Sequence, residues 1–214
     1  MLFAIGRNAD GTITASREKA GQTFTTSEVE DAVLALHSIP PERRSAFAGR
    51  VRNLQKAGLL PGSPGPGRRA AYDCFDVAAW VIIFALTEAG LQPSEIAPAL
   101  PLVEPKVIKV FASPDGEADY FLWIRAAWLS RYLQAQADQA PEPITAGVTL
   151  APKLGDVLNE KSIERATVLN LSHLKHRLAS ILPVEWPTEF AYVDQRGQII
   201  VASMSHGAAD TNRK

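Results

Sequence analysis

Seven lysine and arginine residues lie between Pro40 and Tyr72, where Glu42 is the only acidic residue, so the segment carries a net charge of +6. They are Arg43, Arg44, Arg50, Arg52, Lys56, Arg68 and Arg69. The whole chain has a net charge of -1, and residues 73–105 hold five acids and no cation. Clustered cations neutralise neighbouring phosphates and release condensed counterions, which drives binding to nucleic acid. The pattern therefore predicts a phosphate-binding face, the alternative being a solvated basic face paired with the acidic segment.

Other patterns that could carry chemistry are weaker. His173 and His176 stand three apart, a spacing that can hold a metal, but no third ligand is near, so a solvated helix face is the favoured interpretation. Residues 115–119 lack the ordered oxygen ligands of a calcium loop. The single cysteine, Cys74, stands beside Phe75 and is expected to pack in the core. No phosphate loop, catalytic triad or paired-carboxylate signature is present. We therefore expect no enzyme, metal or cofactor.

Composition indicates a globular, cytoplasmic protein. The chain has 214 residues, 46% of them hydrophobic, enough for one large domain or two small ones. Its longest apolar run, from Ala78 to Leu86, is far shorter than the roughly 18 residues of a membrane span. The N-terminus lacks the basic and apolar regions of a secretory signal. One cysteine fits a reducing compartment.

Two helices and a turn-rich segment are expected to position the cations. Thr25 or Ser27, each with a glutamate three residues on, can cap a first helix. Pro41 suits the first turn of a second helix, which ends near Gly58 and carries five of the seven cations. Residues 61–67, Pro-Gly-Ser-Pro-Gly-Pro-Gly, cannot form regular structure. A hairpin or wing is expected there, with Arg68 and Arg69 at its base.

Further helices are expected at 76–89, in a short segment from Pro93 that Pro98 and Pro101 limit, at 118–137 and at 162–182. The helix at 118–137 would carry an aromatic face, interpreted as core or dimer seam or, alternatively, as an effector surface. Its residues are Phe121, Trp123, Ile124, Trp128 and Tyr132. Hairpins are expected around residues 10–11 and 196–197.

Three segments in order carry a family resemblance. Residues 52–61 read Arg-Asn-Leu-Gln-Lys-Ala-Gly-Leu-Leu-Pro, Tyr72 stands four residues before Asp76, and residues 86–96 read Leu-Thr-Glu-Ala-Gly-Leu-Gln-Pro-Ser-Glu-Ile. Over about residues 25–100 the chain thus resembles the MerR-type winged helix-turn-helix transcription regulators. The resemblance implies a second helix in the major groove, a wing on the DNA backbone, and phosphate contact by Arg52. Asn53 and Leu54 replace the two tyrosines of the family signature, so groove contacts are not carried over.

We therefore expect a mainly α fold, in which an N-terminal winged helix-turn-helix precedes a helical C-terminal domain with a small β-hairpin. The expected parts are an arm or hairpin at 1–24, the DNA-binding domain at 25–104, a connecting or dimerisation helix at 105–139, and a C-terminal domain at 140–214.

The expected function is sequence-specific binding of double-stranded DNA and transcription regulation as a homodimer at the nucleoid, with RNA polymerase as a further partner. The expected DNA-binding residues are the seven cations and Tyr72. One alternative is a phage excisionase-like or architectural DNA-binding factor. Another is a protein-interaction module whose winged helix no longer binds DNA.

Overall fold

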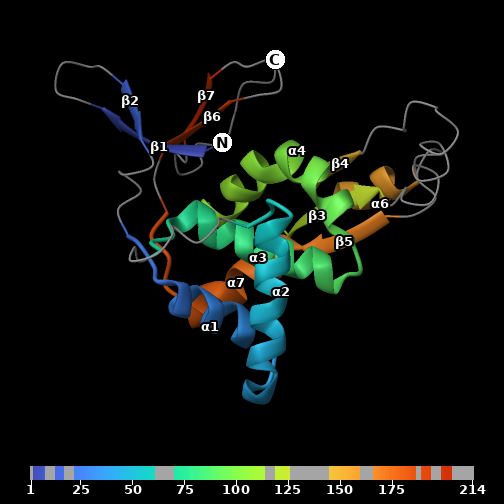
Figure 1. Ribbon diagram of the computed structural model, residues 1–214. Coiled ribbons are helices and arrows are strands. Elements are labelled where there is room, and N and C mark those ends of the chain that lie inside the picture. Colours follow the sequence, from blue (N-terminus) through green and yellow to red (C-terminus); the bar gives the residue numbers. More distant parts are fainter. Residues whose placement is uncertain are drawn as a thin grey trace, which may run out of the picture.

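The computed structural model describes residues 2–7, 13–16, 22–60, 70–113, 119–125, 145–159, 166–186, 189–193 and 199–203. The protein is mainly helical (Figure 1). Its helices are α1 (Thr26–Leu36), the short 3-10 helix η2 (Pro41–Arg43), α2 (Arg44–Lys56), α3 (Cys74–Glu88), α4 (Pro93–Ala112), α6 (Ala151–Leu158) and α7 (Leu171–Ile181). The strands are β1 (Leu2–Arg7), β2 (Ile13–Ser16), β3 (Tyr120–Arg125), β4 (Ala146–Leu150), β5 (Ala166–Asn170), β6 (Glu189–Val193) and β7 (Ile199–Ser203).

Capping side chains mark the starts of α1 and α3, and glycines follow the ends of α2 and α3. Thr25 caps α1 in a reciprocal capping box with Glu28, whose Oε2 accepts from the Thr25 backbone N–H at 2.7 Å. Asp73 caps α3 in the same way, so this helix begins at Cys74, slightly before the expected start at Asp76. Gly58 and Gly90 follow the C-terminal ends of α2 and α3 with φ of 72° and 92°, values that glycine adopts without strain.

Helix α3 is buried along nearly its whole length and lies among the other helices in Figure 1. Helices α1 and α4 pack against it. A row of aromatic rings connects it to α2: Tyr72 meets Trp80 edge-on at 5.6 Å, Trp80 stacks on Phe84 at 5.9 Å, and Phe84 stacks on Phe47 at 4.9 Å between centroids. This row fixes α2 on the core and leaves its opposite side in solvent.

Helix α4 is longer than expected. Its 20 residues include three internal prolines, at 98, 101 and 105, so the prediction of a short helix limited by Pro98 and Pro101 is wrong. Each proline removes one backbone donor and crowds the preceding turn. The helix nevertheless continues because its other face, including Ile96, Val103 and Val107, is buried in the core.

The segment expected to be a helix over 118–137 contains strand β3 instead. β3 is the middle strand of an antiparallel sheet with the order β4-β3-β5. Its burial alternates, with Leu122 and Ile124 buried and their neighbours partly exposed. The expected helix over 162–182 likewise divides into β5 and α7. Both errors arise because runs of large apolar residues satisfy a helical and an alternating pattern at once.

The two expected hairpins are confirmed. β1 pairs with β2, and β6 pairs with β7, both antiparallel. β1 also pairs with β6, so segments from the two ends of the chain form one sheet with the order β2-β1-β6-β7. Residues 2–7 are therefore joined to the expected C-terminal domain and do not form a separate arm.

A continuous buried cluster crosses the expected domain boundaries. It extends from Phe24 through α1 to α4 and on to Leu122 and Leu178. α7 packs on both α1 and α4. The side-chain amide of Gln22 donates to the Pro183 carbonyl at 3.1 Å. Helix α7 and the strand β3 therefore share one core with the N-terminal helices. The expected boundaries near residues 104 and 139 do not separate two cores.

Candidate nucleic-acid interface

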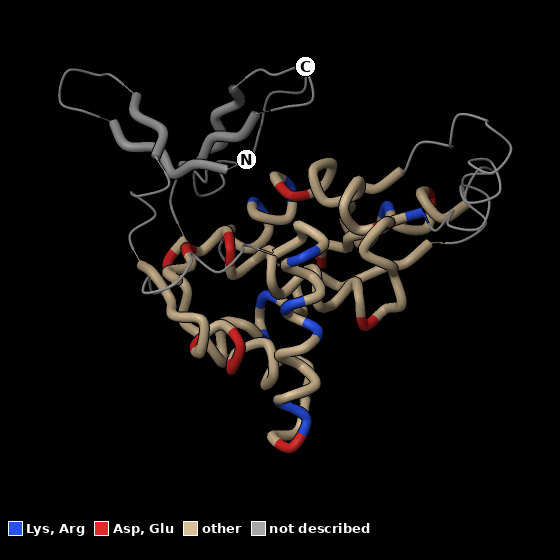
Figure 2. The backbone as a smooth tube through the Cα atoms, viewed as in Figure 1, with Lys and Arg blue, Asp and Glu red and all other residues tan. Residues whose placement is uncertain are grey.

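The side chains of α2 divide into a buried face and a broad solvent-exposed face. Phe47, Val51 and Leu54 are at most 5% exposed and attach the helix to the core. The five cations of this region, Arg43, Arg44, Arg50, Arg52 and Lys56, are all exposed. Lys and Arg positions recur along α2 from one end to the other (Figure 2). An α-helix turns about 100° per residue, so sequence spacing shows which cations share a side.

Arg52 and Lys56 stand four residues apart and therefore lie on the same side of α2, away from the buried face. Gly49 and Asn53 lie between this side of α2 and the side of Arg50, and both line the groove described next. Within the described part of the chain, neither Arg52 nor Lys56 makes an ion pair. These two cations are thus available to a phosphate backbone.

Arg43, the last residue of η2, and Arg50 of α2 lie on a different side from Arg52 and Lys56. They line a groove of about 850 Å³ between α2, the end of α3 and the start of α4. Residues 50 and 52 diverge by about 200° around the helix axis. The expectation that all these cations form one outward surface is therefore correct only in part.

Arg44 lies on the side of α2 that faces α1. Its Nη1 is 2.7 Å from Oδ1 of Asp31, and both side chains are about half exposed. The Ser27 hydroxyl donates to the other Asp31 oxygen at 3.3 Å. Nearby, burial raises the pKa of Glu30, and Arg44 opposes that effect. Arg44 is thus engaged by an acid of the same fold, although by Asp31 of α1 and not by the acidic segment at 73–105 that the solvated-face alternative named.

Tyr72 is placed differently from the expectation. It is 3% exposed, packs edge-on against Trp80, and forms an isolated antiparallel bridge with Phe24 through two backbone hydrogen bonds of 2.8 Å. Tyr72 therefore belongs to the core and holds the start of α3 beside the start of α1. Arg68 and Arg69 lie outside the described residues, so their expected contacts stay predictions.

The expected aromatic face is not the face of a helix. In β3, Phe121 and Trp123 point to one side of the sheet, whereas Ile124 is 1% exposed and points to the other. Trp123 lies opposite Gly147 of β4. Trp128 and Tyr132 lie outside the described residues. Phe121 and Trp123 are partly exposed on one side of the sheet, and Ile124 does not belong to this aromatic surface.

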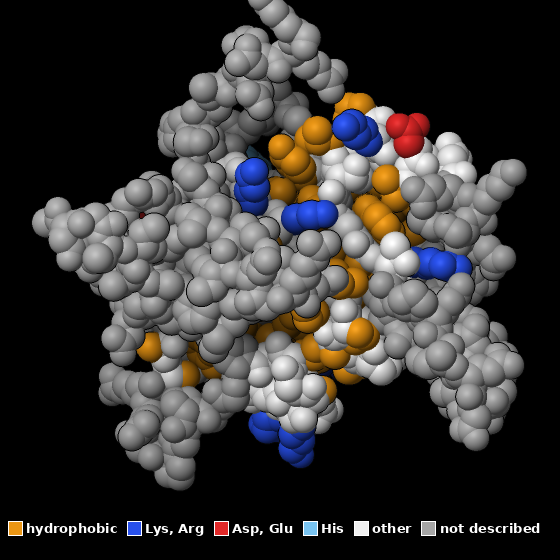
Figure 3. All heavy atoms as spheres, turned by 90° about the horizontal axis from the view of Figure 1, so that it is seen from above, with side chains coloured by type: hydrophobic (Ala, Val, Ile, Leu, Met, Phe, Trp, Pro, Cys, Tyr) orange, Lys and Arg blue, Asp and Glu red, His pale blue; other side chains and the backbone are white. Residues whose placement is uncertain are grey.

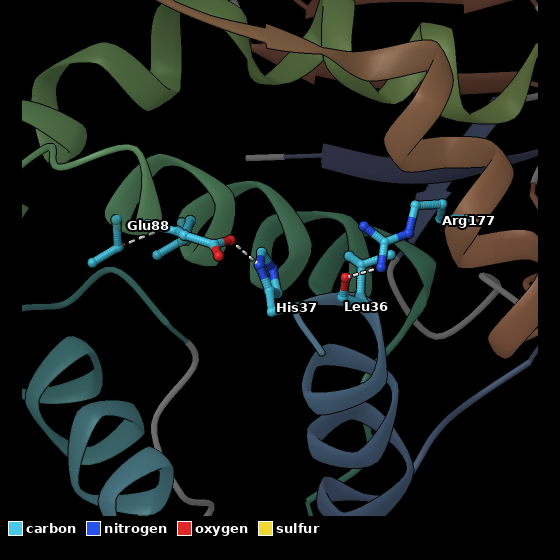
Figure 4. A network of polar contacts seen from close by, with 6 residues as sticks. Leu36, His37, Glu88 and Arg177 are labelled. Atoms are coloured by element: carbon cyan, nitrogen blue, oxygen red, sulfur yellow. Dashed lines mark hydrogen bonds and ion pairs between the residues drawn. The ribbon is translucent and has the colours of Figure 1, made fainter. Parts of the chain in front are cut away.

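The structure also shows a polar contact that the sequence did not indicate. His37, which ends α1, is 7% exposed in its side chain, and its Nδ1 contacts a carboxylate oxygen of Glu88 at the end of α3 (Figure 4). The Arg177 guanidinium of α7 donates to the carbonyl oxygen of Leu36 beside it. The residues of each pair are 51 and 141 positions apart, so no local spacing could have revealed these contacts.

Cys74 is fully buried, and burial, with a smaller effect of Asp73, raises the pKa of its thiol to about 12. Such a thiol stays neutral and packs as an apolar group. Among the described residues, no three His, Cys, Asp or Glu side chains gather to hold a metal ion. Of the helices in that part of the chain, none is long and apolar enough to cross a membrane.

Away from α2 the cations are dispersed. On the face seen from above, the visible Lys and Arg side chains form several separate groups with hydrophobic side chains between them (Figure 3). Three of the described lysines, at 106, 109 and 153, border a small cavity of about 320 Å³ between α4, β4 and α6. Helix α2, with Arg44, Arg50, Arg52 and Lys56, is thus the element with the most cations among the described residues.

Comparison with known proteins adds no family assignment, because no protein-family model matches the chain and no curated protein is similar to it.

Proposed function

We propose that this protein binds specific sites on double-stranded DNA as a homodimer and regulates transcription, with α2 as the helix that enters the major groove. The observation that carries the proposal is the pair Arg52 and Lys56 on the exposed side of α2, with no carboxylate partner among the described residues. α2 is attached to the core only through its opposite face. The exposed side of a helix attached in this way can contact DNA. The major groove of a duplex is about 12 Å wide, which is enough to admit an α-helix.

The arrangement around α2 supports this use. α1 precedes α2, and the pairing of Phe24 with Tyr72 places the chain before α1 beside the chain that leads into α3. Residues 61–69, where the sequence predicts a wing, lie outside the described residues. The order of α1 and α2 matches the first two helices of the MerR-type head that the sequence resembles. In such a head Arg52 would contact phosphate. We assign Lys56 to phosphate and Asn53 to a base edge, since an amide can pair with adenine through two hydrogen bonds.

The other cations take lesser roles in the proposal. Arg50 and Arg43, at the groove side of α2, can reach a flanking phosphate. Arg44 would first have to leave Asp31, so its net contribution is expected to be smaller.

We propose a homodimer because of the number of base pairs that a specific DNA site must contain. A single head of this kind reads few base pairs, whereas two heads related by a two-fold axis read two half-sites about one helical turn apart. Phe121 and Trp123 provide a partly exposed aromatic surface that a second copy could cover. Light scattering at several concentrations would measure the oligomeric state directly.

Selection of bound fragments from a random duplex pool tests the proposal. The wild-type protein should enrich an inverted repeat, the Asn53→Ala variant should lose preference at one base position per half-site, and Arg52→Ala should weaken binding to all sequences alike. Enrichment of a single asymmetric, strongly bent site would favour the excisionase-like alternative. Absence of any salt-sensitive duplex binding would favour the protein-interaction module.

A further inference from the structure

The groove beside α2 is a second site, and its chemistry goes beyond contact with DNA. Its volume of about 850 Å³ lies within the range of roughly 300–1,000 Å³ typical of pockets for small organic ligands. Residues of η2, α2, α3 and the start of α4 line it. A pocket of this kind binds its ligand through an apolar floor and a few convergent polar groups.

The floor of the groove is aromatic. Phe47 of α2 and Phe84 of α3 stack with their ring centroids 4.9 Å apart and their planes at 29°. Leu54 and Leu91 extend this apolar surface towards the start of α4. Both phenylalanines are 5% exposed, so their remaining accessible edges suit a flat or short hydrocarbon group.

His37 supplies a buried polar atom without a partner. Its Nδ1 faces the Glu88 carboxylate, which can only accept, so Nδ1 carries the hydrogen. Its Nε2 is buried and has no hydrogen-bond partner among the described residues. Buried polar atoms in native proteins are almost always paired, so an unpaired one beside a cavity points to a group that comes from outside. His37 lines this groove and also a smaller cavity next to α7.

The charge on the walls favours an anion. Arg43 and Arg50 line one side of the groove, and neither makes an ion pair within the described part of the chain. The one acid among the lining residues, Glu88, is engaged by His37 (Figure 4). Two guanidinium groups on one wall are well suited to a carboxylate or sulfonate, which accepts paired, charge-assisted hydrogen bonds.

We infer that the groove binds a small amphipathic anion, with its hydrocarbon part on Phe47 and Phe84 and its acidic group between Arg43 and Arg50. A hydrogen-bond donor on the ligand would satisfy Nε2 of His37. Because α2 forms one wall, an occupied groove would neutralise two cations beside the proposed DNA-binding side, so ligand and DNA would weaken each other's binding. This coupling rests on the proposed function, whereas ligand binding does not.

The test uses two probes of similar shape, 1-naphthoate and its neutral methyl ester, titrated calorimetrically into the full chain without DNA. Neither probe has a hydrogen-bond donor, so the two differ only in the charged group that Arg43 and Arg50 would contact. We expect naphthoate to bind about tenfold more tightly than the ester, because charge-assisted hydrogen bonds are the stronger kind. The double variant Arg43→Gln/Arg50→Gln should remove this difference and leave the affinity for the ester unchanged. Equal affinities for the two probes in the wild-type protein, or no binding of either, would overturn the inference.

Two control variants separate this inference from the proposed function. Arg52→Gln alters the same helix outside the groove and should keep the wild-type affinity for naphthoate while it weakens DNA binding. Lys109→Gln, on α4, should change neither. If Arg43→Gln/Arg50→Gln binds naphthoate as tightly as Arg52→Gln does, the acidic group does not lie between those arginines and the site is wrong. Circular dichroism of each variant checks that it remains folded.

Discussion

Substitution of Gly147 by alanine tests the strand pairing that replaced the expected helix. A Cβ at residue 147 would lie 2.9 Å from Cζ2 of Trp123 and 3.0 Å from Cε2 and Nε1, closer than real Cβ atoms approach other heavy atoms. The indole of Trp123 or the backbone of β4 must therefore shift. Overpacking of this kind costs about 1–3 kcal/mol. The lower entropy of the unfolded chain offsets about 0.4–1 kcal/mol, which leaves a net loss between about 0 and 2.6 kcal/mol, with about 1.3 kcal/mol as the central value.

Urea denaturation followed by circular dichroism measures this loss as a change in the free energy of unfolding. The matched control is Gly155→Ala in α6, where an added Cβ meets nothing within 4 Å and alanine should stabilise the helix by about 0.5–1 kcal/mol. A double-mutant cycle combines Gly147→Ala with Trp123→Val. The two changes should show an interaction free energy of at least about 0.5 kcal/mol, because a valine at position 123 leaves room for the new methyl group. A Gly147→Ala substitution that stabilises the protein, together with no coupling to Trp123→Val, would refute the pairing of β3 with β4.

Three further predictions concern single groups. The Cys74 thiol, with its pKa raised by burial to about 12, should react with a disulfide reagent at about pH 8 only as fast as the protein unfolds, and rapidly in urea. Hydrogen bonds from Thr25 lower the pKa of Glu28 from 4.5, so the charged carboxylate contributes stability above pH 4.5 that is lost as the pH falls through its lowered pKa. Melting temperatures of Glu28→Gln should therefore depend less on pH in this acidic range than those of the wild type. Arg44→Gln should cost only about 0.2–1 kcal/mol in urea denaturation, because its partner Asp31 is half exposed, and should weaken DNA binding less than Arg52→Gln does.

The parts of the fold that could be predicted from the sequence are those that local chemistry decides. The features that define α1 to α3 involve groups within a few residues of one another. They are the capping pair Thr25 and Glu28, the glycines at 58 and 90, and the apolar spacing of residues 47, 51 and 54. The two terminal hairpins follow from alternation around turn residues in the same way. Their union in one sheet depends on a pairing between residues 2–4 and 190–192, which no local pattern encodes.

The errors have a common physical origin, which is tertiary burial that overrides local preference. α4 tolerates Pro98 and Pro101 because its opposite face is fixed in the core. β3 is a strand because Trp123 and its neighbours find partners in β4 and β5, far along the chain. For the candidate site, the sequence showed which cations α2 carries. It did not show that Asp31 engages Arg44 or that Tyr72 is buried.

The salt dependence of DNA binding tests the central claim most directly. Fluorescence anisotropy with a fixed duplex, repeated over a range of salt concentrations, gives the slope of log K against log salt concentration, and each phosphate contact contributes about -0.9 to it. If Arg52 and Lys56 contact phosphates, the variant Arg52→Ala/Lys56→Ala should have a slope smaller in magnitude by about 1.8. Binding by this variant with the wild-type affinity and slope would contradict the account.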